Sequence, residues 1–450
     1  MSPIRLNHAS ALRIGHLSPF WLMLGVTLLS PAQSSQTAPP VPTAPDVVAG
    51  IPVNYDEGMA ASYSLPDALT LSNGKQVKDT GTWWSKRRPE IVSLFETQQF
   101  GRAPSRPTGE SFDLFDPGTP ALQDKAIRKQ VRIYLTNDKT GPSIHLLVYL
   151  PKGRTTPAPV LLNINFMAVQ NAIDDPQIKP ETVWDPKTDT RVSPPSSRFG
   201  HLDVMPLLDA GVGVATFYYG DVDPDYPEGF SNGIRALYLK TGQTERGPED
   251  WGSIAAWAWG MSRVEDYFET DHDIDAHRVA VLGISRLGKT VMWAGAVDQR
   301  FAAVIASCSG EGGAALSHRN YGETIAHLTA PSRYPYQFAE NYGKYAGFPD
   351  KAPMDANLLI ALIAPRPLLL QTGNTDRWSD PKGEFLAEVA AGPVYRLLGK
   401  QDLGTDVWPQ PGQLLLHDLS YYMHEGGHGT IPSDWNIIVE FLKTYLHPKQ

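Results

Sequence analysis

Segments with the pattern of buried strands alternate with segments typical of amphipathic helices from about residue 80 to the end of the 450-residue chain. Two of these segments, 130–136 and 144–151, have the composition of neighbouring antiparallel strands. Apolar runs that indicate buried strands follow at 158–166, 212–225, 278–285, 301–310, 365–374 and 413–420. This alternation predicts an α/β domain with a mostly parallel central sheet that is covered by helices on both faces, and ligands bind such a sheet beyond the carboxyl ends of its strands.

Two helices and two insertions can be placed from their spacing and composition. The segment 253–268 gathers apolar side chains on one helical face, namely Ile254, Trp257, Ala258, Met261, Val264 and Phe268. An amphipathic helix at 434–446 closes the chain. The stretches 168–208 and 311–357 do not fit the alternation and are rich in Pro, Asp, Tyr and Arg. Insertions of this kind over the strand ends are expected to shape a substrate cleft.

The net charge and the cysteine content narrow the classes of protein to consider. A net charge of −9 argues against nucleic acid as a partner, because phosphate binding needs a basic face. Cys308 is the only cysteine, so no intrachain disulfide can form.

The N-terminus has the three parts of a secretion signal. Arg5 and Arg13 form a positive region, an apolar run follows, and the small residues "SPA" end at Ala32. The apolar run is too short to span a bilayer as a mature anchor. We therefore expect a signal peptide at 1–32, a flexible linker at 33–55, and one folded domain at 56–450 that is periplasmic or secreted, without a membrane partner.

The stretch "MHEGGHGT" at 423–430 contains the letters H-E-x-x-H of zinc peptidases. Two histidines four residues apart bind one metal only if they share a face of one helix. Gly426 and Gly427 lie between the histidines here, and each glycine costs a helix about 1 kcal/mol relative to alanine. Gly429 and Pro432 follow. The segment therefore indicates a flexible loop that presents one catalytic histidine, and not a zinc site.

The segment "RVAVLGISRLGKTVMWAGAV" is a strand, a turn and a helix with Ser285 in the turn. It resembles the G-x-S-x-G nucleophile elbow, except that Leu287 takes the last glycine position and Gly288 comes one residue later. An elbow lifts the serine hydroxyl above the sheet and directs the N–H of Arg286 towards a developing oxyanion. A plain turn with a capping serine fits the same residues, so a base and an acid must be found elsewhere.

α/β-Hydrolases supply these partners in the chain order serine, acid, histidine. The stretch "PLLLQTGNTDRWSDP" carries Asp376 and Asp380 after an apolar strand. We prefer Asp376 because it lies nearer the strand end, whereas Asp380 precedes a proline and can cap a helix. We prefer His428 as the base over His424 because glycines flank it and allow a close approach to Ser285.

The residues around the serine resemble a known family. "GISRLGKT" has the G-x-S-R-x-G-K form of the glucuronoyl esterases, and the likeness to the bacterial branch covers roughly residues 60–446. Other similar stretches are "WWSKRRPEIVSLFETQQFGRAP", "SGEGGAALSHRNYGET", "IALIAPRPLLL" and "DRWSDPKGEF". The resemblance implies an α/β-hydrolase three-layer sandwich. It also implies a serine esterase that cleaves the ester between (4-O-methyl-)glucuronate of glucuronoxylan and lignin alcohols, with no metal or cofactor.

The family pattern can be carried over residue by residue. It implies that Ser285 is the nucleophile, that His428 is the base, and that Arg286 stabilises the oxyanion through its N–H and its guanidinium. It also assigns substrate contacts to Lys289, Glu323 and Trp378. The residues themselves allow plainer roles, namely a solvated lysine, a glutamate paired with an arginine such as Arg319, and a tryptophan in the core.

The triad acid departs from the fungal pattern. Fungal members place a glutamate just before "SG" after the sixth strand, and this chain has Cys308 there. A thiol cannot orient and charge-stabilise an imidazolium as a carboxylate does. Some bacterial members carry the acid after the next strand, where this chain has Asp376, so the resemblance implies that the acid has moved. Glu311 lies three residues beyond the vacated position, and its side chain need not reach the histidine.

These observations together predict a monomeric, exported ester hydrolase whose partner is a glucuronoxylan and lignin-carbohydrate ester. Four alternatives remain at this point. They are another serine carbohydrate esterase such as an acetyl-xylan esterase, a peptidase of the same fold, a binding protein on an inactive hydrolase fold, and a zinc peptidase.

Overall fold

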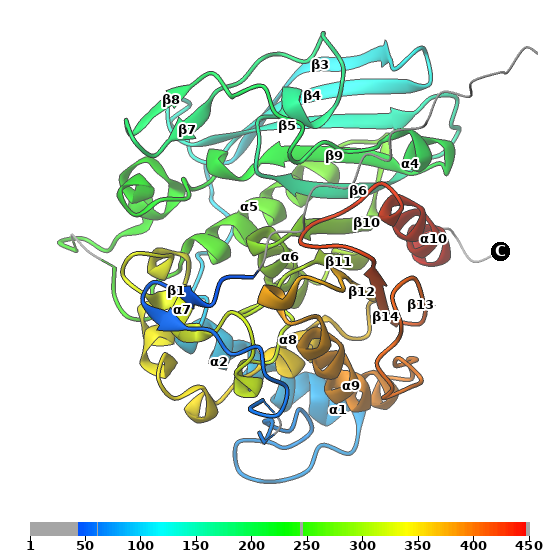
Figure 1. The fold of residues 1–450 in the computed structure, drawn as a ribbon. Helices are drawn as coiled ribbons and strands as arrows, with labels where there is room; N and C mark the ends of the chain where they lie inside the picture. The colour runs from blue at the N-terminus through cyan, green and yellow to red at the C-terminus, as the bar shows by residue number, and fades with distance from the viewer. Residues whose placement is uncertain (1–43, 61, 244–245, 447–450) are drawn as a thin grey trace, which may run out of the picture. The chain divides into compact units, whose positions relative to one another are not determined.

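The computed structural model describes residues 44–446 except 61, 244 and 245. The predicted signal peptide 1–32 and the first part of the predicted linker lie outside the described residues. The central feature is a ten-stranded sheet with the order β13-β14-β12-β11-β10-β6-β9-β5-β4-β3 (Figure 1). Its strands are β3 (Ser111–Ala121), β4 (Ala126–Tyr134), β5 (Ser143–Pro151), β6 (Ala158–Asn165), β9 (Gly213–Tyr218), β10 (Ile274–Ile284), β11 (Ala303–Ser307), β12 (Leu368–Gly373), β13 (Leu414–Leu415) and β14 (Leu419–His424).

The middle of this sheet is parallel. Neighbouring strands from β9 through β6, β10, β11 and β12 to β14 all pair in parallel. Antiparallel pairs add β5, β4 and β3 at one edge and β13 at the other. The prediction of a mostly parallel sheet is therefore confirmed, as is the antiparallel pairing of the strands near 130–136 and 144–151.

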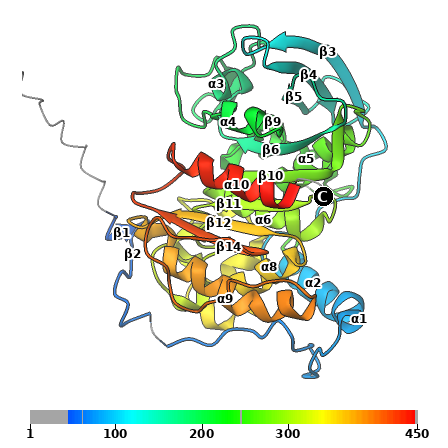
Figure 2. The same cartoon turned by 90° about the vertical axis from the view of Figure 1, so that its right-hand side faces the viewer.

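Helices cover both faces of the sheet. One apolar cluster packs five helices against it, namely α2 (Arg88–Gln98), α5 (Ser253–Phe268), α6 (Arg286–Val297), α8 (Ala356–Ile363) and α9 (Pro381–Leu397). A second cluster on the opposite face holds α3 (Val169–Ala172), α4 (Met205–Asp209) and α10 (Asp434–Leu446). Figure 2 shows α10 lying across the β10–β11 part of the sheet. None of the helices in the described part of the chain is long and apolar enough to cross a membrane.

The strand β10 shows how the sequence produces these layers. Val279 and Val281 pack in the first apolar cluster, and Ala280 and Leu282 pack in the second, because successive side chains of a strand point to opposite faces. A run of apolar residues without polar interruptions therefore fits a strand that is buried on both sides.

The helix α5 begins and ends where the sequence predicts, but it is buried on every side and not on one face only. Its outer side is covered by chain from the connection after β9. There Trp257 donates a hydrogen bond from Nε1 to the carbonyl of Asp223 at 2.7 Å.

The predicted strand 413–420 is placed wrongly. Residues 413–418 are exposed or half-buried and contribute only the two-residue edge strand β13. The buried strand is β14, which runs on to His424. The apolar run of leucines therefore lies at the rim, and the aromatic run that follows it enters the sheet.

Residues 47–52 of the expected flexible linker form a β-hairpin. β1 (Val47–Val48) pairs antiparallel with β2 (Ile51–Pro52) across a tight turn. Ala49 and Gly50 both have positive φ angles, 52° and 78°, which is the geometry that two-residue hairpin turns favour. Arg377 donates from Nη2 to the carbonyl of Tyr55 at 2.8 Å and so ties this segment to the domain.

Short elements build the two insertions and the remaining connections. The first insertion holds the small hairpin of β7 (Val183–Asp185) and β8 (Thr190–Val192). The others are α1 (Thr80–Thr82), η1 (Trp83–Arg87), η2 (Tyr219–Asp221), η3 (Pro227–Asn232), η4 (Ile234–Tyr238), η5 (Ser317–Arg319), α7 (Ile325–Thr329), η6 (Pro335–Gln337), η7 (Glu340–Tyr345), η8 (Pro349–Lys351) and η9 (Arg377–Ser379).

Candidate active site

Four side chains of interest follow the carboxyl ends of four neighbouring strands. Ser285 follows β10, Cys308 follows β11, Asp376 follows β12, and His428 follows β14. These strands are adjacent and parallel, so their carboxyl ends meet at one edge of the sheet. Residues separated by up to 143 positions in the sequence, as between 285 and 428, are brought together in this way.

Ser285 occupies a strained turn between β10 and α6. Its φ and ψ angles are 59° and −126°, a conformation that few residues other than glycine adopt. The turn is possible because Gly283 has no side chain, since a Cβ there would lie 2.1 Å from the carbonyl oxygen of Leu287. A Cβ on Gly288 would lie 3.0 Å from the carbonyl oxygen of Ser307. Gly288 thus provides the close helix–strand approach, and Leu287 is free to pack in the core.

Asp376 and His428 form a direct pair. Oδ2 of Asp376 lies 2.7 Å from Nδ1 of His428, and the hydroxyl of Ser379 lies 3.3 Å from the same nitrogen. Burial pushes the pKa of Asp376 up, but the hydrogen bond and charge of His428, together with Ser379, more than offset this and hold the pKa below its usual value. The carboxylate is therefore ionised and oriented towards the imidazole.

Ser285 and His428 line the same two cavities. Among the described residues, no direct hydrogen bond joins the Ser285 hydroxyl to the His428 ring. Such bonds are often long in enzymes without substrate and shorten when the substrate binds.

Cys308 is a buried thiol beside this pair. Its Sγ accepts a hydrogen bond from the N–H of Gly429 at 3.3 Å. Burial, with a further contribution from the Asp376 charge, raises the pKa of Cys308 far above its usual value, so the group is a neutral thiol.

The two other acid candidates bond elsewhere. Glu311 accepts hydrogen bonds from Ser317 at 2.6 Å and from Tyr342 at 2.8 Å. Asp380 accepts from the N–H of Gly383 at 3.0 Å and so caps α9, and its other oxygen pairs with Nε of Arg319 at 2.9 Å. Neither carboxyl contacts His428.

The H-E-x-x-H letters do not lie on a helix. His424 is the last residue of β14 and is 1% exposed, whereas His428 lies in the loop after it. The two rings therefore do not share a helical face, and the geometry required by the zinc-peptidase alternative is not present.

Cys308, Asp376 and His428 offer ligand atoms within 4.8 Å of one another and are the three described side chains of suitable type that gather in this way. A thiol binds metal as a thiolate, and burial disfavours that form here. The Asp376–His428 hydrogen bond also occupies Nδ1. The trio therefore has the properties of a hydrogen-bonded site and not those of a metal site.

Arg286 lies at the start of α6, and its guanidinium is held in place by an acid that the sequence did not single out. Asp225 pairs with Nη1 of Arg286 at 2.5 Å and also accepts a hydrogen bond from Gln337 at 2.6 Å. The Arg286 guanidinium lies 4.4 Å from the centre of the Tyr334 ring. The stretch "GDVDPD" after β9 contains Asp225, but nothing in its pattern distinguishes this aspartate from its neighbours.

A cavity of about 390 Å³ on one side of Ser285 collects the predicted sugar contacts. Lys289, Glu323 and Trp378 line it together. Glu323 lies 3.7 Å from Nζ of Lys289 and 2.9 Å from Nη2 of Arg333, so its arginine partner is Arg333 and not Arg319. Trp378 is half-buried and faces this cavity, so it is not part of the core.

Arg333 is the cavity residue that sequence reasoning missed. Its buried Nε has no hydrogen-bond partner among the described residues, and its guanidinium lies 5.7 Å from the centre of the Trp378 ring. Burial lowers the pKa of Lys289 in the same cavity. The cavity thus combines hydrogen-bond donors, the carboxylate of Glu323 beside that of Asp376, and an aromatic face, which are groups that bind a sugar ring.

A second cavity, of about 570 Å³, shares Ser285, Arg286 and His428 with the first. Its wall carries the aromatic rings of Phe166, Phe199, Tyr219 and Trp435. Phe199 is 61% exposed and belongs to the first insertion. Both insertions lie at Ser285, since the first lines this cavity and the second lines the other.

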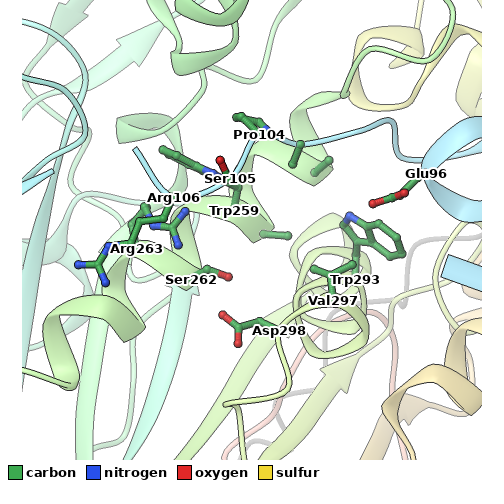
Figure 3. A pocket seen from close by; sticks show the side chains of 13 residues that line it. Glu96, Pro104, Ser105, Arg106, Trp259, Ser262, Arg263, Trp293, Val297 and Asp298 are labelled. Atoms are coloured by element: carbon green, nitrogen blue, oxygen red, sulfur yellow. The ribbon is translucent and has the colours of Figure 1, made fainter. Parts of the chain in front are cut away.

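A third cavity, of about 240 Å³, lies away from the elbow between α5, α6 and the segment 103–106 (Figure 3). Its charged side chains are already paired, since Arg106 contacts Glu110 at 2.7 Å and Arg263 contacts Asp266 at 2.6 Å. It contains none of the residues that follow the carboxyl ends of the strands.

The layered sheet and a serine on a strand–helix elbow define an α/β-hydrolase. The family model described as glucuronyl esterase of fungi matches residues 180–399. Carbohydrate esterase MZ0003, from an unknown prokaryotic organism, is 41% identical over 87% of this chain and 92% of its own length. A 4-O-methyl-glucuronoyl methylesterase 1 of Wolfiporia cocos is 32% identical over 75% of this chain and 73% of its own length.

A solved structure of a glucuronoyl esterase is also similar to this chain. The glucuronoyl esterase from Solibacter usitatus matches with a TM-score of 0.82 and 39% identity, and the match covers 86% of this chain and 99% of that one. The chain belongs to the glucuronoyl esterase family and is a carboxylic ester hydrolase. The resemblance inferred from "GISRLGKT" is thereby confirmed, as is the predicted α/β-hydrolase fold.

Proposed function

We propose that this enzyme hydrolyses esters of (4-O-methyl-)glucuronate, with Ser285 as nucleophile, His428 as general base and Asp376 as the acid that orients it. The observation that carries this proposal is the 2.7 Å bond between Asp376 and His428 beside a strained Ser285, at the junction of two cavities of different chemistry. A carboxylate in that position holds the imidazole in the tautomer that accepts the serine proton and stabilises the imidazolium that forms.

The reaction proceeds through two acyl transfers. Oγ of Ser285 attacks the ester carbonyl while His428 takes its proton, and the oxyanion is stabilised by the N–H and guanidinium of Arg286. Collapse of this intermediate breaks the ester bond, and His428 returns the proton to the departing alcohol. Water then attacks the glucuronoyl-Ser285 ester while His428 takes a proton from it. Collapse of this second intermediate breaks the bond from the acyl carbon to Oγ of Ser285, and His428 returns the proton to Oγ. Asp225 keeps the guanidinium charged and fixed, so its contribution needs no reorganisation during the reaction.

The cavity of about 390 Å³ is the uronate subsite in this proposal. Lys289 and Arg333 donate to the sugar hydroxyls, Glu323 accepts from them, and Trp378 covers a face of the ring. The Arg333 Nε, buried and without a partner, is a donor that a sugar oxygen can satisfy.

The cavity of about 570 Å³ receives the alcohol. Its aromatic wall and the exposed ring of Phe199 suit a lignin-type aromatic alcohol better than a small polar one. We propose that the natural ester lies between glucuronoxylan and lignin. We also propose that the enzyme is monomeric and is exported after removal of residues 1–32.

Hydrolysis rates for matched esters test this function. Benzyl glucuronate should be cleaved with a kcat/KM at least about tenfold above benzyl galacturonate, because the 4-hydroxyl then points away from its donors. A simple acetate ester should be the weakest substrate because it leaves the uronate subsite empty. Equal rates on glucuronate and acetate esters would contradict the proposal and favour a general serine esterase.

A further inference from the structure

The other histidine of "HEGGH", His424, has no task in the mechanism above, yet both of its ring nitrogens have partners. Nδ1 lies 3.0 Å from Oδ2 of Asp434, and Nε2 lies 3.1 Å from the carbonyl oxygen of Gly427. The side chains of His424 and Asp434 are both fully buried, 1% and 0% exposed. His424 ends β14, and Asp434 begins α10.

This pair joins the two ends of the loop that carries His428. Oδ2 of Asp434 also accepts a hydrogen bond from the N–H of Ile431 at 2.8 Å. The loop between His424 and Asp434 is thus closed at its base by the buried contact between these two side chains. His428 lies within this closed loop, directly after Gly427.

The contact with Gly427 is independent of the charge on the ring. Gln371 places Nε2 2.8 Å from Nδ1 of His424 and 3.0 Å from Oδ2 of Asp434. A charged His424 donates from Nδ1 to Asp434, and a neutral ring with its proton on Nε2 accepts at Nδ1 from Gln371. Nε2–H donates to the Gly427 carbonyl in both states.

We propose that His424 is a positioning residue for the reaction. Its ring holds the carbonyl of Gly427. This carbonyl and the N–H of His428 belong to one rigid peptide plane, so the contact also fixes the position of the His428 Cα atom. Asp434 and Gln371 fix the ring of His424, as Asp376 fixes the ring of His428. The inference rests on the proposed role of His428 as the base.

Two amide substitutions separate the contacts of the ring. His424→Gln places an amide nitrogen near the position of Nε2 and retains a donor to Gly427. His424→Asn places one near the position of Nδ1 and retains only the contact with Asp434. We expect kcat on benzyl glucuronate to fall at least about tenfold in the Asn variant with KM changed less than about threefold, because a small misplacement of a catalytic group is costly. The Gln variant should stay within about threefold of wild type in kcat.

His145→Asn is the matched control. His145 is also fully buried and lies 3.2 Å from the carboxylate of Glu181, but it lines neither cavity at Ser285. This variant should lower the melting temperature and leave kcat unchanged, so the replacement of a buried imidazole beside a carboxylate by a smaller amide is by itself accounted for.

Inactivation by phenylmethylsulfonyl fluoride provides a readout without a sugar. Oγ of Ser285 bonds to sulfur, the S–F bond breaks, and His428 takes the serine proton. The second-order rate constant should fall in His424→Asn by the same factor as kcat. If the wild type reacts with phenylmethylsulfonyl fluoride but cleaves no glucuronate ester, the proposed substrate is wrong. The inactivation rates of the His424 variants then still decide whether His424 positions His428. A His424→Asn variant within about threefold of wild type in both rates would overturn it, as would equal losses in the Asn and Gln variants.

Discussion

At the scale of single residues, the acid of the proposed triad is the point at which this chain differs from the fungal pattern. The position after β11 holds Cys308, a neutral thiol, and the position after β12 holds Asp376, an ionised carboxylate bonded to His428. Because β11 and β12 are adjacent and parallel, both positions face the same histidine. The side chains at both strand ends therefore lie within 4.8 Å of the same imidazole.

Substitution of each acid candidate tests this assignment. Asp376→Asn should lower kcat heavily, on the order of 10⁴-fold, because the amide can hold the wrong histidine tautomer and cannot stabilise the imidazolium. Asp380→Asn and Glu311→Gln should cost far less in kcat, since both carboxyls bond to groups outside the pair. Cys308→Ala should leave kcat nearly unchanged. The measurement is kcat on benzyl glucuronate, with folding checked by melting temperature. An Asp376→Asn variant within about tenfold of wild type would show that another acid serves His428.

Loss of the sugar contacts should depend on the substrate. Lys289→Ala and Glu323→Ala should each reduce kcat/KM on benzyl glucuronate at least about tenfold, because a hydroxyl then loses a charged partner. Both variants should cleave a small acetate ester at a rate close to that of the wild type. Parallel kinetics on the two esters provide the check, and equal losses on both would indicate a structural role for the Lys289–Glu323 pair.

At the scale of elements, the sequence predicted those strands and helices whose residues follow a clear apolar repeat and whose ends are marked by glycine. The strands near 158–166 and 278–285 and the helix at 253–268 are confirmed, because a long apolar run or a 3.6-residue repeat leaves few alternatives. The strand predicted at 413–420 was wrong, because the sheet takes only the short edge strand β13 from this run and continues with β14. Only the tertiary packing decides which of two adjacent apolar runs enters the sheet.

The hairpin at 47–52 and the role of Asp225 could not be predicted from the sequence either. The hairpin has a linker-like composition, and long-range contacts such as the bond from Arg377 to Tyr55 hold it in place. Asp225 becomes important only when the fold brings it to Arg286, 61 residues away. Pairings over such distances leave no periodic signal in a single sequence.

The turn that carries Ser285 requires a residue without a side chain at position 283, and this requirement can be tested. Gly283→Ala should lower the melting temperature by several degrees and reduce kcat, because its Cβ would lie 2.1 Å from the Leu287 carbonyl oxygen and the turn must shift. Gly347→Ala is the control, since nothing lies within 4 Å of the Cβ it would add. Thermal unfolding and kcat of both variants check this. Equal melting temperatures for the two variants would mean that the elbow tolerates a side chain at Gly283.

At the scale of the whole molecule, buried carboxyls set the pH dependence of stability. Burial raises the pKa of Glu265, Glu311 and Glu384 to about 8. The folded state therefore keeps protons that the unfolded chain releases above its own carboxyl pKa of about 4.5, so this stability is complete in acid and is lost as the pH rises towards 8. Carboxyls with a lowered pKa, such as Asp376, change the stability only at more acidic pH, so they do not alter its decline towards pH 8.

We predict that the melting temperature falls by several degrees between about pH 5 and about pH 9. Glu265→Gln should flatten this decline, because both oxygens of Glu265 are buried without a hydrogen-bond partner among the described residues and the amide carries no titrating proton. Scanning calorimetry over this pH range provides the measurement. A wild-type melting temperature that rises with pH, or a variant with the same slope, would contradict the assignment of neutral buried carboxyls.

Mass spectrometry of the enzyme quenched during turnover of benzyl glucuronate shows most directly whether it is a glucuronate esterase that acts through Ser285. We expect a glucuronoyl ester on the peptide that contains Ser285. We expect no such adduct in Ser285→Ala, whose turnover should be at least about a thousandfold slower while it still binds the substrate. Near-normal turnover by Ser285→Ala, or an acyl group on a different residue, would contradict this mechanism.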